Sequence, residues 1–254
     1  ISVNHVDLNE KFTSLSVIDN VIQSITDSGS LYKWSGSVPS SPYDKTKPNY
    51  IDKNFINQKK IIKIASSYFG SFILTEENKL YKATPFSNAY SEISSGKSGV
   101  GFLDIATGGS HAIAILSDST LVTWGSNGYG QLGNKSLSES LTPTPVYAGG
   151  QIKNKKFVEI SARNKHSIAL DESGAVYQWG AVIFGQMGNV PQSNIDEPTI
   201  VDFSQVQSSN KKIIKIDAGN HFNLAMGEDS SLFSWGSSHS GVLGNINSSN
   251  SNKD

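Results

Sequence analysis

The chain has 254 residues, of which 37% are hydrophobic and 17% charged, and its formal net charge is −1. This near-neutral balance disfavours binding to nucleic acid or to an anionic membrane, because both need a concentrated basic surface. The sequence contains no cysteine, which excludes disulfides, thiolate metal sites and a cysteine nucleophile. It also has no apolar run near the roughly 20 residues that span a bilayer.

The first half of the sequence contains two related segments in one frame. Counted back from Trp34, apolar residues stand at −22, −19, −9, −3 and −2, and a turn-forming residue stands at −5. In the first segment these are Phe12, Leu15, Ile25, Leu31 and Tyr32, with Gly29 at the turn. In the second, counted from Ala83, they are Ile61, Ile64, Leu74, Leu80 and Tyr81, with Asn78 at the turn. The Pro-rich stretch 37–50 between them predicts a long irregular loop, which is either a partner contact or a simple connector.

Three clearer segments follow, and each contains a tryptophan with a fixed set of glycines after it. Trp124, Trp179 and Trp235 are 55 and 56 residues apart. Glycine recurs at +1, +6 and +9 as Gly125, Gly130 and Gly133, then Gly180, Gly185 and Gly188, then Gly236, Gly241 and Gly244. A phosphate-binding loop occurs once per site and precedes a helix, so three copies indicate a repeat architecture instead. We expect these glycines to allow positive φ and close strand packing.

Short apolar runs separated by Gly, Ser, Asn or Asp are typical of strands and hairpins. A unit of about 50 residues holds four short antiparallel strands, which is one propeller blade. We therefore predict an all-β propeller of about five four-stranded blades, as one domain over residues 1–247 with a flexible polar tail over 248–254. TPTPVY and EPTIV are expected to be strands leading into the next unit. The opening ISVNHVDL would supply the missing strand of the last blade and close the ring.

The clear segments resemble repeats of the regulator-of-chromosome-condensation family. That repeat pairs G-x-x-H-[ST]-x-A-L with W-G-x-N-x-x-G-Q-L-G, and here GGSHAIAI precedes WGSNGYGQLG and RNKHSIAL precedes WGAVIFGQMG. In the third copy GNHFNLAM precedes WGSSHSGVLG, with Phe222 in the histidine place. The resemblance is strong over about 100–245 and weak over 10–95. It implies a propeller that usually has seven blades, so an incomplete or degenerate seven-bladed ring is the alternative to five.

The recurrent aromatic and histidine residues have a structural interpretation. Trp34, Trp124, Trp179 and Trp235 share one position of the frame, and we expect them to fill the space between sheets. His111 and His166 recur with the repeat and are expected to be buried and hydrogen-bonded. The sequence shows no triad, metal-ligand cluster, P-loop or kinase motif, so we predict no catalytic residue, no metal and no cofactor.

One loop departs from its siblings and is the main candidate for partner binding. Val182, Ile183 and Phe184 are apolar where the corresponding loops read SNGY and SSHS. They either contact a partner or pack under the segment 192–201. Asn127, Tyr129 and His239 of the sibling loops complete the set of candidate contacts.

The family resemblance implies a protein-binding propeller that acts on a small GTPase. The favoured hypothesis is a guanine nucleotide exchange factor for a Ran-like or Rab-like GTPase, which works without covalent chemistry by stabilising the nucleotide-free state. A scaffold that binds a GTPase or another protein without exchange is the alternative. The chain also resembles effectors that intracellular bacteria deliver into host cells. We accordingly expect a soluble cytoplasmic protein, of the host cell in that case, and leave open a membrane anchor in a further C-terminal segment.

Overall fold

The computed structural model describes residues 10–18, 21–35, 48–84, 87–183, 185–187, 194–204, 212–237 and 243–244. This part of the chain contains nineteen strands and two single-turn 3-10 helices, η1 (Asn54–Ile56) and η2 (Gly150–Ile152). The prediction of an all-β protein is therefore confirmed.

The strands form five separate antiparallel sheets, one for each segment of the sequence frame. The first sheet contains β1 (Phe12–Ile18), β2 (Val21–Thr26), β3 (Leu31–Ser35) and β4 (Asn49–Ile51). The second contains β5 (Ile61–Ser67), β6 (Gly70–Thr75), β7 (Leu80–Ala83) and β8 (Ser91–Ile93). The third contains β9 (Phe102–Thr107), β10 (His111–Leu116), β11 (Leu121–Gly125) and β12 (Ser140–Pro145). The fourth contains β13 (Phe157–Arg163), β14 (His166–Asp171), β15 (Val176–Gly180) and β16 (Ile195–Ile200). The fifth contains β17 (Ile213–Ala218), β18 (Phe222–Gly227) and β19 (Leu232–Gly236).

The hairpin turn at −5 has the same backbone conformation in all five sheets. The residues there have left-handed φ values: Gly29 (77°), Asn78 (61°), Ser119 (62°), Gly174 (91°) and Ser230 (68°). A left-handed residue matches the right-handed twist of the two strands that the turn joins. The two divergent segments around Trp34 and Ala83 therefore follow the same frame as the clear ones, as predicted.

The outermost strands differ from the prediction in one respect. TPTPVY and EPTIV overlap β12 and β16, but these strands pair with β11 and β15 of their own sheets. They complete the preceding unit rather than begin the next. The cause is the loop after each tryptophan, which turns the chain back beside the strand it has just left.

The core consists of four wedges, one between each pair of neighbouring sheets. Each wedge joins apolar side chains from the second and third strands of one sheet to apolar side chains from the first three strands of the next. Between the third and fourth sheets, for example, Ile113 and Ile115 pack with Phe157, Ile160 and Trp179. A single sheet would leave both of its apolar faces in water, so the sheets stabilise one another by stacking.

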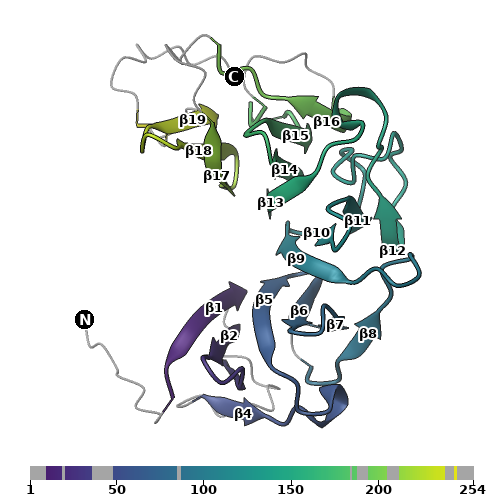
Figure 1. Cartoon of the computed structure of the whole chain (residues 1–254), viewed down its shortest axis with the longest axis vertical. Helices are drawn as coiled ribbons and strands as arrows, with labels where there is room; N and C mark the ends of the chain where they lie inside the picture. The colour runs from purple at the N-terminus through teal and green to yellow at the C-terminus, as the bar shows by residue number, and fades with distance from the viewer. Residues whose placement is uncertain are drawn as a thin grey trace.

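The five sheets follow one another along an arc, with β1, β5, β9, β13 and β17 on its inner side (Figure 1). The first and fifth sheets lie at the two ends of the arc, and their described strands share no pairing. The described strands therefore form an arc of five blade-like sheets, and closure of the ring by the terminal segments stays a prediction. The proposed closing segment, and the tail 248–254, lie outside the described residues.

Candidate functional site

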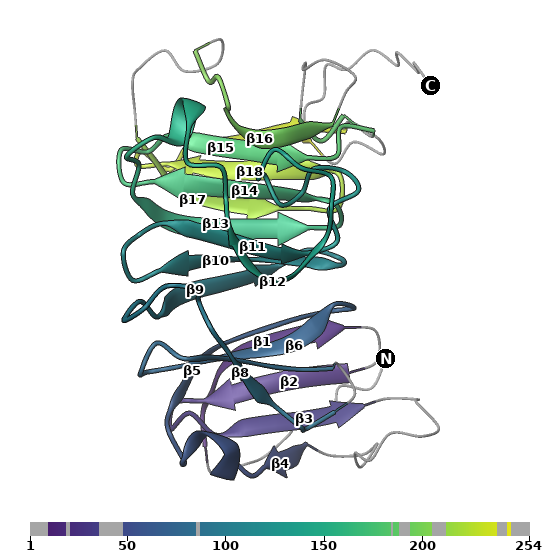
Figure 2. The same ribbon diagram turned by 90° about the vertical axis from the view of Figure 1, so that its right-hand side faces the viewer.

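Where the structure describes them, two kinds of loop lie at the same end of the sheets, which we call the loop face. One kind is the short turn between the first and second strands, and the other is the longer loop that follows the third strand. The register places both together, since His111 at the start of β10 is opposite Gly125 at the end of β11. The strands run nearly parallel to one another in side view, so these loops collect along one edge of the arc (Figure 2).

A hollow of about 440 Å³ lies on the loop face near the axis of the arc. It is lined by first turns from all five sheets, including Ile18, Ser67, Gly109, Arg163 and Asn220. Hydroxyl, amide and backbone groups make up most of the wall, and Arg163 is the one charged residue among those that line it. The polar wall can thus form hydrogen bonds with a group inserted along the axis, and Arg163 can pair with a negative charge on that group.

Arg163 occupies a position at which the neighbouring sheets have glycine. A Cβ on Gly108 would lie 2.1 Å from the His111 ring, and a Cβ on Gly219 would lie 2.4 Å from the Phe222 ring. These glycines therefore make room for the ring three residues later. In the fourth sheet the chain has an exposed arginine instead, and β13 extends to pair Arg163 with His166. This departure from G-x-x-H was visible in RNKH and was the signal that sequence reasoning missed.

The two repeat histidines join neighbouring sheets. His111 Nε2 is 2.9 Å from Ser167 Oγ, and His166 Nε2 donates to Asn223 Oδ1 at 2.8 Å. Both rings are fully buried, and this burial lowers the pKa of His111 to about 3 and that of His166 to about 4. Both histidines are therefore neutral at pH 7 and enclosed in the structure, which rules out a role for them as accessible bases.

The glycine at +1 from each repeat tryptophan is required by the backbone of its own sheet. Gly125, Gly180 and Gly236 have φ values of 107°, 111° and 121°. A Cβ there would lie 2.5 to 2.7 Å from the carbonyl oxygen of Ser110, Lys165 or His221. Gly133, at +9, instead faces the next sheet, where a Cβ would lie 2.7 Å from Trp179 Nε1. The glycines at +1 thus allow the loop to turn sharply away from the strand. Gly133, at +9, allows the tryptophan of the next sheet to pack against the loop.

The other glycines at +6 and +9 also have positive φ where the structure describes them. Gly130, Gly185 and Gly244 have φ values of 76°, 72° and 67°. Gly188 and Gly241 lie outside the described residues.

Two of the four tryptophans are fully buried and two are half-buried. Trp124 and Trp179 lie inside wedges. Trp34 lies at the end of the arc, and Trp235 lies against the fourth sheet, where its Nε1 donates to Gln178 Oε1 at 2.8 Å. All four lie at the end of the third strand of their sheets, as their shared position in the frame predicts.

Asn127 is a candidate contact that the structure contradicts. Its side chain is buried, its amide donates to the carbonyls of Ser136 and Ser138, and its Oδ1 accepts from Leu132 N–H. A polar loop residue that satisfies three backbone groups internally holds the loop together and offers no surface to a partner.

Tyr129 and Lys165 form an accessible pair beside the hollow. Lys165 Nζ lies 4.0 Å from the centre of the Tyr129 ring, which is half-buried. Lys165 belongs to the same turn as Arg163 and Asn164. The aromatic candidate is thus accompanied by a cation, a combination that can bind an acidic partner group.

The apolar loop after Trp179 is partly exposed. Ala181 is buried, Val182 is half-buried and Ile183 is 57% exposed. Phe184 and His239 lie outside the described residues. Ile183 therefore remains a candidate partner contact.

The described residues contain no group of three or more His, Asp or Glu side chains that could hold a metal ion. No helix in this part of the chain is long and apolar enough to cross a membrane.

Comparison with known families agrees with the repeat frame. Residues 102–131 match one model of the Regulator of chromosome condensation (RCC1) repeat, and residues 118–170 and 173–226 match a second. The chain contains RCC1 repeats. Its solved structural neighbours include human WBSCR16, with a TM-score of 0.77 at 18% identity, over 92% of this chain and 63% of that one. The yeast protein Prp20p from Saccharomyces cerevisiae has a TM-score of 0.56 at 15% identity, over 92% and 73%.

The curated relatives are much longer proteins. The ultraviolet-B receptor UVR8 of Arabidopsis thaliana is 33% identical over 142 residues, which is 55% of this chain and 30% of that protein. The probable E3 ubiquitin-protein ligase HERC6 of Homo sapiens is 31% identical over 152 residues, or 59% and 14%. The chain thus spans less than a third of either relative. The match establishes the repeat and the propeller architecture, whereas the activities of these proteins are their own.

Proposed function

We propose that the loop face binds a small GTPase of the Ran or Rab type and accelerates release of its guanine nucleotide. The observation on which this rests is the hollow at the axis, where the turns of all five sheets meet around Arg163. A rigid face with one cation and neighbouring aromatic and apolar side chains is suited to a protein surface that carries negative charge.

The chemistry required is compatible with what this face offers. Exchange needs no covalent step, only tighter binding of the nucleotide-free GTPase than of the nucleotide-bound form. The repeat family supports the choice of a GTPase, as does the solved structure of Prp20p, which was described together with its binding properties to Gsp1p and histones. Action inside a host cell as a delivered bacterial protein stays a prediction from the resemblance.

A scaffold without exchange activity is the second candidate. It is favoured by the names of the relatives, since the same repeats occur in a photoreceptor and in ubiquitin ligases. Fold alone does not select between binding and exchange.

The test is the release of fluorescent GDP from a panel of purified Ran and Rab GTPases, with and without the protein. We expect acceleration for one GTPase, and a loss of about tenfold in Arg163→Ala, since removal of an interface anchor costs roughly 1–2 kcal/mol. Ile183→Ser should have a smaller effect. Leu141→Ser is the matched control, because Leu141 is 82% exposed on the outer strand β12. Stable binding without acceleration would identify the scaffold, and neither binding nor acceleration would refute the proposal.

A further inference from the structure

At the third junction, the loop that follows the third strand of one sheet also covers part of the next sheet. This loop, residues 126–139, joins β11 to β12. Its Lys135 N–H donates to the Asp196 carbonyl of β16 at 2.8 Å. The Gln131 carbonyl of the same loop accepts a hydrogen bond from Trp179 Nε1 at 2.9 Å. A segment of backbone therefore lies against the outer strand of the next sheet and satisfies a buried indole N–H.

The second junction differs because the loop of the second sheet is shorter. Residues 84–90 join β7 to β8, and this segment is half the length of 126–139. Trp124 has the place of Trp179 in the sequence frame and is only 1% exposed. Its Nε1 nevertheless has no hydrogen-bond partner in the described part of the chain. A buried donor without an acceptor is unfavourable, so an acceptor supplied at this place would stabilise the folded chain.

A hollow of about 450 Å³ lies at this junction, and we call it the outer groove. Its two walls come from β8 and β12, which both lie on the outer side of the arc (Figure 1). Ile93 lines one wall, Leu141 and Pro143 line the other, and Trp124 and Lys82 complete the lining between them. The outer groove thus combines apolar walls with two groups that can donate hydrogen bonds.

Leu141 is exposed because no loop crosses it. It is the second residue of β12, as Asp196 is the second residue of β16. A Cβ on Gly130 of the loop 126–139 would lie 2.9 Å from Asp196 Cα, so the loop packs directly on that position. Leu141 is 82% exposed. The outer groove therefore presents an apolar side chain at the position that is covered in the next sheet.

Lys82 is the one cation among the residues that line the outer groove. The equivalent residues Thr123 and Gln178 donate to carbonyls of their own loops, at 2.7 and 3.1 Å. Lys82 Nζ instead lies 3.5 Å from the centre of the Phe69 ring, and it has no ion pair with a described residue. Glu92, the one acidic residue of the lining, is already paired on its own sheet. The groove thus favours an occupant that supplies acceptors or negative charge.

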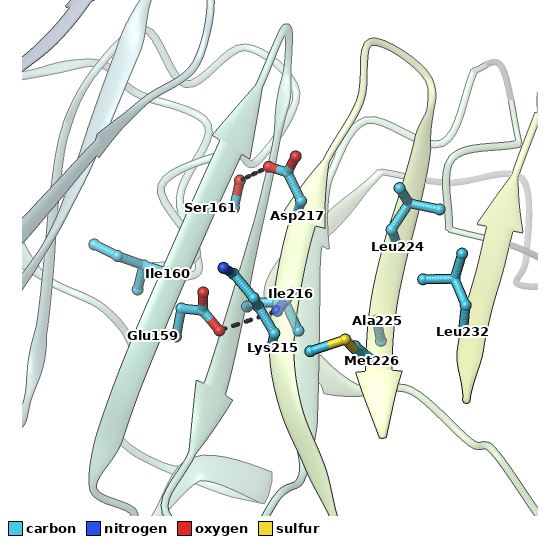
Figure 3. Close-up of a pocket in the computed structure, with 10 residues that line it drawn as sticks. All are labelled: Glu159, Ile160, Ser161, Lys215, Ile216, Asp217, Leu224, Ala225, Met226 and Leu232. Atoms are coloured by element: carbon cyan, nitrogen blue, oxygen red, sulfur yellow. Dashed lines mark hydrogen bonds between the residues drawn. The ribbon is translucent and has the colours of Figure 1, made fainter. Parts of the chain in front are cut away.

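The inner strands of the same junction are joined directly. An ion pair between Lys63 and Asp104 links β5 to β9. A comparable link exists at the fourth junction, where Glu159 accepts a hydrogen bond from Ile216 N–H at 3.0 Å (Figure 3). The second junction is therefore closed on its inner side and open on its outer side. It lies inside the arc, away from the two end faces, which are the outward faces of the first and fifth sheets.

We propose that the outer groove binds an extended segment of a partner protein, in the place that the loop 126–139 takes at the third junction. Backbone carbonyls of the segment accept hydrogen bonds from Lys82 and from the Trp124 indole, and an apolar side chain packs on Leu141 and Pro143. A basic segment is disfavoured, since both polar groups of the groove are donors. The outer groove shares no lining residue with the hollow around Arg163, so it is a second binding surface, independent of the one proposed for a GTPase.

The test begins with a displayed library of random dodecapeptides, from which binders of the purified chain are selected. Each selected peptide is then titrated into isotope-labelled protein while the indole N–H resonances of the four tryptophans are followed by NMR. We expect the Trp124 resonance to move downfield and saturate, because its N–H gains an acceptor, and the other three to change little. Trp124→Phe assigns this resonance.

Two variants locate the binding. Leu141→Ser removes the exposed apolar contact, and Lys82→Met removes the cation but keeps its stem, so both should fold, as thermal unfolding checks. Each should weaken peptide binding about tenfold. Ile200→Ser is the matched control, because Ile200 is exposed on the outer strand β16, outside the groove. Leu141→Ser should leave nucleotide release from a GTPase unchanged, which separates this groove from the loop face.

Three results would each overturn the proposal. The first is a library that yields no binder. The second is a set of peptides whose affinity neither Leu141→Ser nor Lys82→Met alters. The third is binding that leaves the Trp124 resonance where it was.

Discussion

The first and the third junctions of the arc are built from different residues but have the same plan. Between the third and fourth sheets, His111 meets Ser167, and Ser167 donates to the Gln131 carbonyl at 3.1 Å. Between the first and second sheets, where the G-x-x-H motif is absent, buried Gln23 accepts from Ser71 at 2.6 Å and from Tyr90 at 2.9 Å. In both places a buried polar group links one sheet to the next within an apolar wedge.

The second junction shows what happens when no such group is present. Gly70 takes the histidine place, and the stem of Lys82 fills the space, with its Nζ 3.5 Å from the centre of the Phe69 ring. Trp124 Nε1 has no hydrogen-bond partner in the described part of the chain, whereas Trp179 Nε1 donates to Gln131 O at 2.9 Å. The apolar wedge is thus common to all three junctions, whereas the buried polar link differs between two of them and is missing from the third.

If the wedge is dominant, removing its largest side chain will have the largest effect. Trp179→Ala should lower the free energy of unfolding by about 3–5 kcal/mol, because it leaves a cavity in a fully buried site. Trp34→Ala, at the half-buried end of the arc, should cost less than half as much. Denaturant titration of both variants measures the difference, and equal losses would contradict the assignment of Trp34 to an open face.

Acid should distinguish the histidine junctions from the others. The folded pKa is about 3 for His111 and about 4 for His166, whereas the unfolded pKa is 6.5. Between these values the side chain is neutral in the folded protein and protonated in the unfolded chain. The unfolded state then binds more protons, so stability falls as the pH drops below 6.5, by about 2 kcal/mol per histidine by pH 5.

Unfolding free energies measured at pH 7 and pH 5 test this expectation. His111→Asn combined with His166→Asn should reduce the pH dependence. Gln23→Asn, at a junction without histidine, should leave it unchanged. An undiminished slope in the double variant would refute the assignment.

The two polar links should contribute similar, modest amounts to the free energy of unfolding. Ser71→Ala and Ser167→Ala should each cost about 1–2 kcal/mol, because each leaves a buried partner without its hydrogen bond. Double-mutant cycles of Ser71 with Gln23 and of Ser167 with His111 measure the two couplings. A coupling near zero at one junction only would show that the two links are not equivalent.

The smallest effect concerns Lys33, which is a buried cation near the first junction. Its Nζ donates to the Ser87 carbonyl at 2.9 Å, and burial lowers its pKa to about 7. The unfolded chain keeps this proton up to about pH 10.5, so the folded state gains stability as the pH rises from 7. Lys33→Met should therefore stabilise the protein at pH 7 and do so to a smaller extent at pH 9, and thermal unfolding at the two pH values measures the difference.

The sequence predicts the sheets well because their signals are local and repeated. The apolar positions before Trp34 and Ala83 located two divergent sheets, and the residue at −5 located five turns. The arc was not predictable in the same way, since the angle between sheets arises from side-chain packing across each wedge. Closure of a ring depends on the sum of those angles.

The candidate site was only partly predictable, for two physical reasons. A polar loop residue such as Asn127 looks the same in sequence whether it faces water or its own loop carbonyls. The hollow around Arg163 is formed by turns from five sheets, so no local stretch contains it. Ile183 was located because an apolar residue among polar siblings is a local signal.

The most direct test of the loop face as a binding site is amide hydrogen exchange of the chain with and without nucleotide-free Ran. The account predicts protection in the turns 108–110 and 163–165 and in the loop 181–183, with little change in the opposite turns 117–119 and 172–174. Protection confined to the opposite turns, or to the exposed end faces, would contradict it.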